Sequence, residues 1–351
     1  MLRASQPLPR STPEAEGVSS AGIEDFVKAA DREIHVMHSF MLVRHGKVVA
    51  EGWWKPHTPT ELHVMHSLSK SVTGTAAGFA IAEGKLKLDD PVLKFFPEVA
   101  AADPSANLRA MTVRDLLTMN TGQEKEPKFN KTTPWLKTFF TAPIPHQPGT
   151  HFLYNSSAIY VLSVILQKVT GQTVLDYLTP RFFEPLGIDN PTWDLSPEGV
   201  NLGYAGLHLR TEDVAKYGLF YLHKGEWNGK QLLPVSWAEA SVSKQVPNDE
   251  GTGARKDTDS RQGYGYNFWL ARHGAYRASG AYGQISFVMP DQDAVVAITA
   301  NADAMQKIAP VIFDHLLAAF QTGPLPADPA ALESLKRTMA GLAVPADETP
   351  R

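Results

Sequence analysis

A serine stands three residues ahead of a lysine at the start of a long apolar segment, in Ser67-Leu68-Ser69-Lys70. The following residues are mostly small or apolar as far as Gly84, a residue type that commonly ends a helix. The segment therefore predicts a buried helix that begins close to Ser67. Residues three apart share one helix face, so the Lys70 amine can reach the Ser67 hydroxyl.

This pair can support nucleophilic catalysis without a histidine. Burial disfavours the charged form of lysine, and a neutral amine can accept the serine proton. The N-terminus of a helix also presents backbone N–H groups and a positive dipole end where an oxyanion would form. The alternative interpretation is an N-capping serine beside a solvated lysine, and these residues alone leave both open.

The same spacing occurs a second time, in Ser241-Val242-Ser243-Lys244. Here the next residues are polar and include proline and glycine, which predicts a loop instead of a buried helix. We interpret this second match as a chance occurrence. Residues 245–262 are predicted to form a loop, and the sequence does not show whether that loop closes over a substrate.

Composition removes several functional classes. The chain has 351 residues, a formal net charge of -4 and no basic cluster, so a nucleic-acid partner is not expected. It has no cysteine, which excludes disulfides, thiolate metal sites and cysteine nucleophiles. Residues 1–13 lack the apolar segment of a secretion signal, and no apolar run approaches the ~20 residues of a membrane span. We expect a cytoplasmic protein without a membrane partner, or a periplasmic one if the chain is already processed.

Strand patterns lie at both ends of the chain, and helix patterns lie between them. Strands are predicted at 39–44, 48–54, 264–271, 275–278, 284–289 and 294–300, and helices at 20–32, 156–170, 173–183, 211–223, 233–241 and 308–320. The expected fold is α/β (α+β), an antiparallel sheet flanked by helices with an inserted, mainly helical region. We place the sheet domain at 1–87 and 204–351 and the inserted domain at 88–203.

The segment His-Val-Met-His-Ser occurs at 35–39 and again at 63–67. The similarity does not extend on either side, so we treat it as coincidence and not as an internal repeat. His63 and His66 could be imagined as metal ligands. No HExxH pattern or acidic partner accompanies them, so a structural role is favoured, and we expect neither a metal nor a cofactor.

Three motifs follow one another in the chain: Ser67-Leu68-Ser69-Lys70, then Pro148 to Ser156 with Tyr154-Asn155-Ser156, then Ala278-Ser279-Gly280-Ala281. This order resembles the serine β-lactamase and penicillin-binding-protein superfamily. The similarity covers roughly residues 12–320. It resembles most the class C-like branch, which includes family VIII carboxylesterases and 6-aminohexanoate-dimer hydrolases. A β-lactamase/transpeptidase-like fold is the expectation that follows.

The resemblance implies an acyl-enzyme mechanism. Ser67 would attack an ester or amide carbonyl, with Lys70 and Tyr154 as general base and acid. The pKa of Tyr154 would fall beside the charge of the lysine. The N–H groups of Ser67 and Ala281 would form the oxyanion hole. Ser156, Ser279 and Gly280 would then contact the substrate.

The chain departs from the superfamily pattern at two positions. Penicillin-recognising members have Tyr-x-Asn as their second motif, and here Ser156 takes the third place. Their third motif begins with Lys or His, and here Ala278 stands there. A cation at that position would anchor the carboxylate of a β-lactam or peptide. Arg277 is adjacent, but strand alternation would point it to the opposite face.

These departures favour a carboxylesterase or small-amide hydrolase that acts on a small-molecule substrate. The alternatives are a class C-like β-lactamase, a D-amino-acid peptidase, and a non-catalytic penicillin-binding-like or sensor protein. No Gly-x-Ser-x-Gly elbow and no phosphate-binding glycine motif is present. The sequence does not define the acyl group, the leaving group or the oligomeric state.

Overall fold

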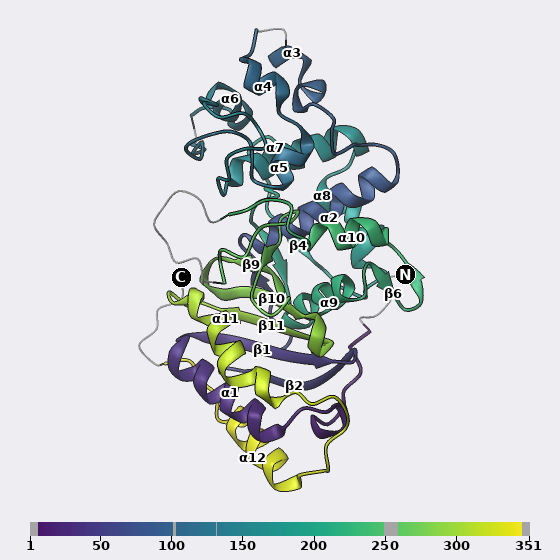
Figure 1. The fold of residues 1–351 in the computed structure, drawn as a ribbon, viewed down its shortest axis with the longest axis vertical. Coiled ribbons are helices and arrows are strands. Elements are labelled where there is room, and N and C mark those ends of the chain that lie inside the picture. Colours follow the sequence, from purple (N-terminus) through teal and green to yellow (C-terminus); the bar gives the residue numbers. More distant parts are fainter. Residues whose placement is uncertain (1–5, 101–102, 131, 249–258, 346–351) are drawn as a thin grey trace. The chain divides into compact units, whose positions relative to one another are not determined.

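The computed structural model describes residues 6–100, 103–130, 132–248 and 259–345 (Figure 1). Residues 249–258, in the middle of the predicted loop 245–262, lie outside the described residues. Internal contacts divide the chain into unit 1, with Met1–Met65, His208–His223 and Ala271–Arg351, and unit 2, with His66–Leu207 and Lys224–Leu270. This division groups residues 66–87 and 224–270 with the helical region, whereas we expected both segments in the sheet domain.

Unit 1 is built on an antiparallel sheet that uses both ends of the chain. Its strands run in the order β2, β1, β11, β10 and β9, so the last three come from the C-terminal part of the sequence. Their bounds are β1 (Met37–Arg44), β2 (Lys47–Trp53), β9 (Tyr276–Gly280), β10 (Gln284–Met289) and β11 (Ala294–Ala300). The strands predicted at 39–44 and 48–54 are confirmed and form the hairpin of β1 and β2, with His45 and Gly46 both at positive φ.

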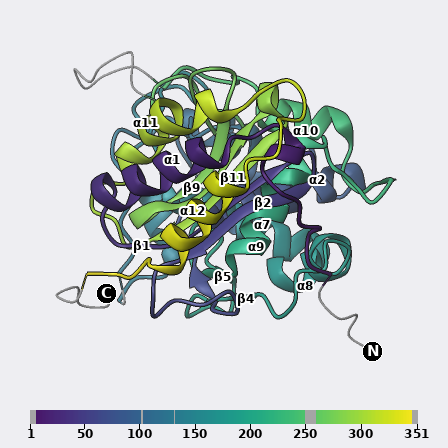
Figure 2. The same cartoon turned by 90° about the horizontal axis from the view of Figure 1, so that it is seen from below.

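Helices cover both faces of this sheet because side chains alternate along each strand. Phe287 and Val296 belong to one hydrophobic core with residues of α1 (Ser20–Glu33), α11 (Ile308–Val311) and α12 (Pro329–Ala340). Figure 2 shows these three helices on one side of the sheet. Their neighbours Ser286 and Val295 face α9 (Thr211–Leu222), where Gly218 leaves room for them. The hydroxyl of Ser286 donates to the Val214 carbonyl at 3.0 Å.

Strand β1 contains an irregularity that re-aims one side chain. Met37 pairs with Ala300 and Ser39 pairs with the adjacent Thr299, so His38 has no partner on β11. Such a bulge changes the direction of the extra residue relative to the regular strand. A short strand β3 (His63–Val64) pairs with β5 (Leu207–Leu209) in the same unit through His63 and Leu209.

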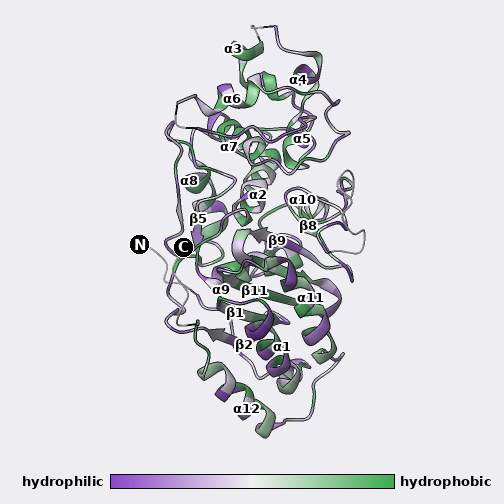
Figure 3. Cartoon of the chain, turned by 90° about the vertical axis from the view of Figure 1, so that its left-hand side faces the viewer, coloured by the Kyte–Doolittle hydropathy of each residue, from purple (hydrophilic) through white to green (hydrophobic). Residues whose placement is uncertain are grey.

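Unit 2 is mainly helical and centres on α2 (Leu68–Ala82) packed against α7 (Ser156–Thr170). Both helices are rich in buried apolar residues, and α7 is among the hydrophobic elements in Figure 3. Around them lie α3 (Pro97–Ala100), α4 (Ala106–Ala110), α5 (Val113–Leu117), α6 (Trp135–Thr141), α8 (Val174–Leu178) and α10 (Val235–Ser241). The strand β4 (Thr192–Trp193) belongs to the same unit. Gly78 of α2 lets the indole of Trp237 on α10 approach closely.

The helix α7 has the bounds predicted for it, but the strand predicted at 264–271 is wrong for most of its length. Within that described segment the only strand is β8 (Trp269–Leu270), and Tyr264 forms isolated bridges to Val246 and Trp269. Gly263 and Asn267 have positive φ and turn the chain, and the Asn267 amide donates to the Leu117 carbonyl at 2.8 Å. The alternating apolar residues belong to a loop, and periodicity alone cannot distinguish such a buried loop from a strand.

Within the described ranges, no single helix is both long and apolar enough to cross a bilayer. Only the bent pair formed by α7 and the helical segment Val174–Phe183 meets the criterion, and it does so as a pair.

Candidate active site

The proposed nucleophile lies at the sharp entry to helix α2. His66, the residue before it, has a φ of 45°, in the left-handed region that residues other than glycine rarely adopt. Ser67 occupies the N-cap position, yet within residues 66–82, all of them described, its hydroxyl makes no capping hydrogen bond to the helix. The N-capping interpretation is therefore wrong, and the hydroxyl takes another partner.

That partner is the amine of Lys70. Lys70 Nζ lies 2.8 Å from Ser67 Oγ and donates to the Tyr204 carbonyl at 3.2 Å. Lys70 is only 1% exposed, so the solvated lysine of the alternative interpretation is also wrong. Burial lowers the pKa of Lys70 from 10.5 to about 7, against an opposing contribution from Glu126. Near neutral pH a large fraction of this amine is therefore uncharged and able to accept a proton.

Tyr154 completes the predicted group. Its ring lies beneath Lys70, with Nζ 4.7 Å from the ring centroid. Burial raises the pKa of Tyr154 to about 12, and a hydrogen bond with Ser67 only partly opposes this rise. The expected fall in the pKa of Tyr154 is thus a wrong prediction. It assumed a charged lysine, whereas burial makes the Lys70 amine largely neutral and also disfavours a phenolate.

Two residues that the sequence did not single out also belong to this group. Tyr204 supplies the carbonyl that accepts from Lys70, and its ring centroid lies 5.8 Å from Nζ. The Glu126 carboxylate acts electrostatically on the pKa values of Lys70, Tyr154 and Tyr204. Neither residue carries a local signal, because each joins the site only through the folding of a long connection.

The segment before Tyr204 also fixes the helix that carries Ser67. The Thr73 hydroxyl of α2 donates to the Gly203 carbonyl at 2.8 Å. Gly203 has a φ of 71°, and a Cβ there would lie 2.9 Å from the Ser163 Cβ and 3.1 Å from the Ile159 carbonyl oxygen of α7. A glycine is therefore required where this segment passes α7 and meets α2.

Aromatic side chains pack around Tyr154 and, in a second group, around Tyr204. Tyr154 packs against Trp269 and Tyr264, with ring centroids 5.2 Å and 6.4 Å away, and Phe152 contacts both of them. A second aromatic group contains Phe129, Trp135, Tyr160 and Tyr204. Phe152, Trp269, Phe129 and Trp135 are each partly exposed and can present apolar surface to a ligand.

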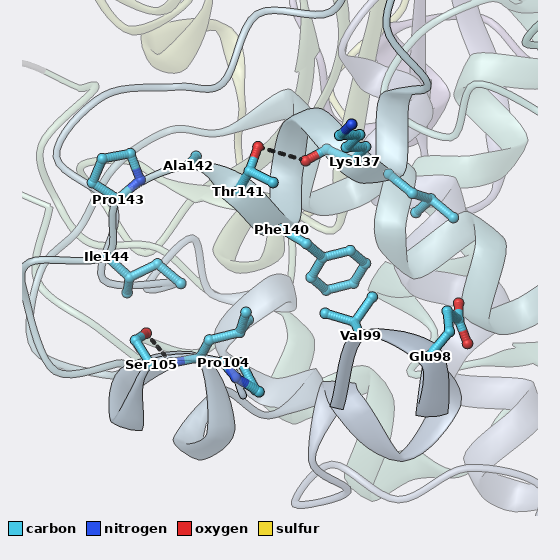
Figure 4. A pocket seen from close by; sticks show the side chains of 12 residues that line it. Glu98, Val99, Pro104, Ser105, Lys137, Phe140, Thr141, Ala142, Pro143 and Ile144 are labelled. Carbon is cyan, nitrogen blue, oxygen red and sulfur yellow. Dashed lines mark hydrogen bonds between the residues drawn. The ribbon is translucent and has the colours of Figure 1, made fainter. Parts of the chain in front are cut away.

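The three aromatic residues of α6 have different surroundings. Phe139 is completely buried and is core. Phe140, together with Leu136, Val99 and Ile144, lines a cavity of about 660 Å³ (Figure 4). The described residues that line this cavity do not include Ser67, Lys70 or Tyr154. Only Trp135 reaches the aromatic group that contains Tyr204.

The second motif begins helix α7. Asn155 caps the helix, accepting from the Ala158 N–H at 3.2 Å, and its amide donates to Gln123 Oε1 at 2.6 Å. The Ser156 N–H donates to Glu126 Oε1 at 2.6 Å. The motif thus places Tyr154 beside Lys70 and holds the carboxylate of Glu126. A substrate contact by Ser156 stays a prediction.

The third motif lies in unit 1, at the end of β9. Ala278 is fully buried and pairs with Ser286 on β10, and Ser279 and Gly280 complete the strand. Ala281 follows in a short helical turn in which Tyr282 has a φ of 61°. The roles predicted for Ser279, Gly280 and Ala281 stay predictions.

Residues 29–319 match the beta-lactamase family model. The chain belongs to the beta-lactamase family. The 6-aminohexanoate-dimer hydrolase of Paenarthrobacter ureafaciens is 24% identical over 280 residues, covering 74% of this chain and 71% of that relative. Two further curated relatives are matched over 66% and 40% of their own length.

Solved structures of the beta-lactamase family show the same fold. A Bacillus anthracis protein named as a candidate 6-aminohexanoate-dimer hydrolase has a TM-score of 0.70 and 20% identity, covering 93% of this chain and 90% of the other. EstCE1, a hydrolase with promiscuous acyltransferase activity, has a TM-score of 0.66 and 19% identity, covering 84% and 98%. The expected β-lactamase/transpeptidase-like fold and the predicted family resemblance are both confirmed.

Proposed function

We propose that this member of the beta-lactamase family is a serine hydrolase that cleaves esters or small amides through a Ser67 acyl-enzyme, with no metal ion taking part in catalysis. The observation that carries the proposal is the 2.8 Å contact between Ser67 Oγ and the amine of the buried Lys70. A base with a pKa of about 7 is well matched to proton transfer at neutral pH.

The raised pKa of Tyr154 assigns the two proton-transfer roles within this proposal. Lys70 Nζ accepts the Ser67 proton as Oγ attacks the carbonyl carbon. The Tyr154 phenol, protonated at neutral pH, donates its proton to the leaving oxygen or nitrogen and recovers a proton from the Lys70 ammonium. Lys70 then deprotonates water, which attacks the acyl-enzyme carbonyl. The bond from the carbonyl carbon to Ser67 Oγ breaks, the acid leaves, and the Lys70 ammonium returns its proton to Oγ.

The developing oxyanion needs hydrogen-bond donors. The proposed donors are the N–H groups of Ser67 and Ala281, as the family resemblance implies. Glu126 places a negative charge near Lys70 and Tyr154, which disfavours a phenolate at Tyr154 and supports its role as a donor. Partly exposed rings around Tyr154 and Tyr204 favour an apolar acyl or leaving group.

Ala278 favours ester or amide chemistry over β-lactam turnover. It is buried and uncharged, and it stands where penicillin-recognising members carry a cation for the substrate carboxylate. A 6-aminohexanoate-dimer hydrolase and a hydrolase with acyltransferase activity among its relatives point the same way. Class C-like β-lactamase, D-amino-acid peptidase and non-catalytic binding functions become the alternative outcomes of the test.

The test combines covalent labelling with turnover. Wild type and Ser67→Ala are exposed to a fluorophosphonate and weighed by intact-protein mass spectrometry, and p-nitrophenyl butyrate and nitrocefin hydrolysis are measured on the same samples. We expect one adduct in wild type, none in Ser67→Ala, and ester turnover that exceeds nitrocefin turnover. Dominant nitrocefin turnover would favour the β-lactamase alternative. Absence of both adduct and turnover would favour a non-catalytic protein.

A further inference from the structure

Three histidines converge in unit 1, although they are distant in the sequence. His38 comes from the bulge in β1, His57 from the connection after β2, and His63 from β3. The rings of His38 and His57 stack with centroids 3.8 Å apart, and the His63 centroid lies 5.4 Å and 5.6 Å from them. One ring nitrogen from each residue lies within 4.8 Å of the other two.

Two ring nitrogens of this cluster are buried without a hydrogen-bond partner among the described residues. They are His38 Nδ1 and His63 Nε2, and His63 is only 7% exposed. A buried polar atom without a hydrogen-bond partner raises the free energy of the folded state, so two such nitrogens in one cluster need an explanation. A metal ion bound to the lone pairs of both nitrogens would supply it.

The third histidine has the support that a metal ligand requires. His57 Nδ1 lies 2.9 Å from a carboxylate oxygen of Glu61. Metal-binding histidines commonly donate their second N–H to a carboxylate, which fixes the tautomer and orients the ring. This contact leaves His57 Nε2 as the nitrogen available for an ion.

The donor set also indicates the kind of ion. Neutral imidazole is the form of histidine that binds metals. Three neutral nitrogens with no thiolate suit Zn²⁺ and its neighbours in the first transition series.

We propose that His38, His57 and His63 form a binding site for Zn²⁺ or a similar divalent transition-metal ion, with Glu61 orienting His57. Two nitrogens bound to one tetrahedral Zn²⁺ lie about 3.4 Å apart, from Zn–N bonds of about 2.0–2.1 Å. The ligand nitrogens lie within 4.8 Å of one another, so the site must contract by up to about 1.4 Å on binding. The stacked rings of His38 and His57 must also turn, because the lone pair of each nitrogen lies in the plane of its ring and both must point at one ion. His57 lies on a connection between strands, which is the part of the site best able to move.

The repeated His-Val-Met-His-Ser segments take different roles in this site. The first segment contributes its second histidine, His38, whereas the second segment contributes its first, His63. His35 is exposed and is therefore a matched control within the same five-residue sequence. A second possible metal cluster, Glu124, His146 and His151, lies in unit 2 and is more exposed. A variant that removes one ligand of this second cluster is therefore needed as a control.

The experiment measures Zn²⁺ affinity of the full chain by calorimetry after treatment with a chelator and dialysis. Wild type, His35→Asn and His146→Asn should each bind one ion with the same affinity. Glu61→Gln should weaken binding by about 10–100-fold, the usual effect of removing a supporting carboxylate. His63→Asn removes a direct ligand and should weaken binding by more than about 100-fold.

A second measurement separates loss of the site from loss of the fold. Thermal unfolding is followed with and without Zn²⁺, since a ligand that binds only the folded state raises the Tm. Wild type and His35→Asn should be stabilised by Zn²⁺, and Glu61→Gln, whose side chain is partly exposed, should be stabilised less. Equal affinity in wild type and Glu61→Gln, no tight ion in wild type, or loss of the ion in His146→Asn would each overturn the proposal.

Discussion

The chain contains the sequence Ser-x-Ser-Lys twice, at 67–70 and at 241–244, and the two copies have opposite surroundings. Ser67 precedes the first turn of α2, so Lys70 lies one turn along the same helix and is buried. Ser241 is the last residue of α10, so Lys244 falls beyond the helix and is exposed. The Ser241 hydroxyl donates to the Trp237 carbonyl at 2.8 Å. Position on the helix, and not the motif, decides whether the serine meets its lysine.

Burial then turns the geometry into chemistry. An exposed lysine keeps its charge near neutral pH and cannot accept a proton, whatever serine lies near it. Lys70 differs because desolvation brings its pKa down to about 7. Ser241 bonds to Trp237, and Lys244 lies beyond the end of α10 and is exposed, which agrees with the interpretation of Ser241-Val242-Ser243-Lys244 as a chance match.

The largest contrast is expected between the two lysines. Lys70→Ala removes the base that activates Ser67 and should lower kcat/KM for p-nitrophenyl butyrate by about 10⁴-fold, the upper end for general-base catalysis. Lys244→Ala should leave kcat/KM unchanged. Steady-state kinetics on both variants tests this, and a similar loss in the two variants would contradict the assignment of Lys70 as the base.

Tyr154 should show a smaller but clear effect. Tyr154→Phe keeps the ring beside Lys70 and removes only the proton donor, so kcat should fall by about 10²-fold. Tyr160→Phe is the matched control, because its hydroxyl contacts Ser196 and Glu198 instead. Comparing an ester that has a good leaving group with an amide sharpens the test. The amide should suffer more, since its nitrogen must be protonated to leave.

The pH dependence reports on the same base. Lys70 must be uncharged to accept the serine proton, and its pKa is lowered to about 7. Activity should therefore be retained above pH 7 and should fall by up to tenfold for each unit below it. A profile of kcat/KM between pH 5 and 9 measures this. A rate that is flat down to pH 5 would show that a group other than Lys70 carries the proton.

The smallest effect belongs to the second serine. Ser241→Ala removes one buried hydrogen bond to Trp237 and should lower the free energy of unfolding by about 1 kcal/mol. Urea denaturation measures that change, and kcat/KM should not move. Any loss of fluorophosphonate labelling in Ser241→Ala would mean that the two copies of the motif had been assigned the wrong way round.

Much of the fold was readable from local patterns. Helix α7 and strands β10 and β11 have the predicted bounds because each is a periodic segment with turn residues or caps at its ends. The region 264–271 was misread, because its apolar residues pack in a segment that turns at Asn267. Periodic apolar residues indicate burial, and a buried loop can show nearly the same alternation of apolar residues as a strand.

The sequence predicted some residues of the candidate site better than others, because some of them meet only through the fold. Ser67 and Lys70 are adjacent on one helix, so their contact follows from spacing alone. Tyr154 needed the family resemblance, and Glu126 and Tyr204 were missed because only folded connections bring them to Lys70. The lowered pKa of Lys70 was foreseen from burial, whereas the raised pKa of Tyr154 was missed because the sequence did not show that its hydroxyl is buried too.

The close approach at Gly203 has a consequence for anyone who alters the specificity of this protein by random mutagenesis. The carbonyl groups of Gly203 and Tyr204 fasten α2 through Thr73 and Lys70, and the contact with α7 leaves no room for a side chain at residue 203. A library that varies this segment will mostly return inactive clones that fail for steric reasons. Phe152, Trp269 and Trp135 are better positions to randomise, because their rings are partly exposed. Substitutions there can reshape the apolar wall and leave the hydrogen bond from Lys70 to the Tyr204 carbonyl in place.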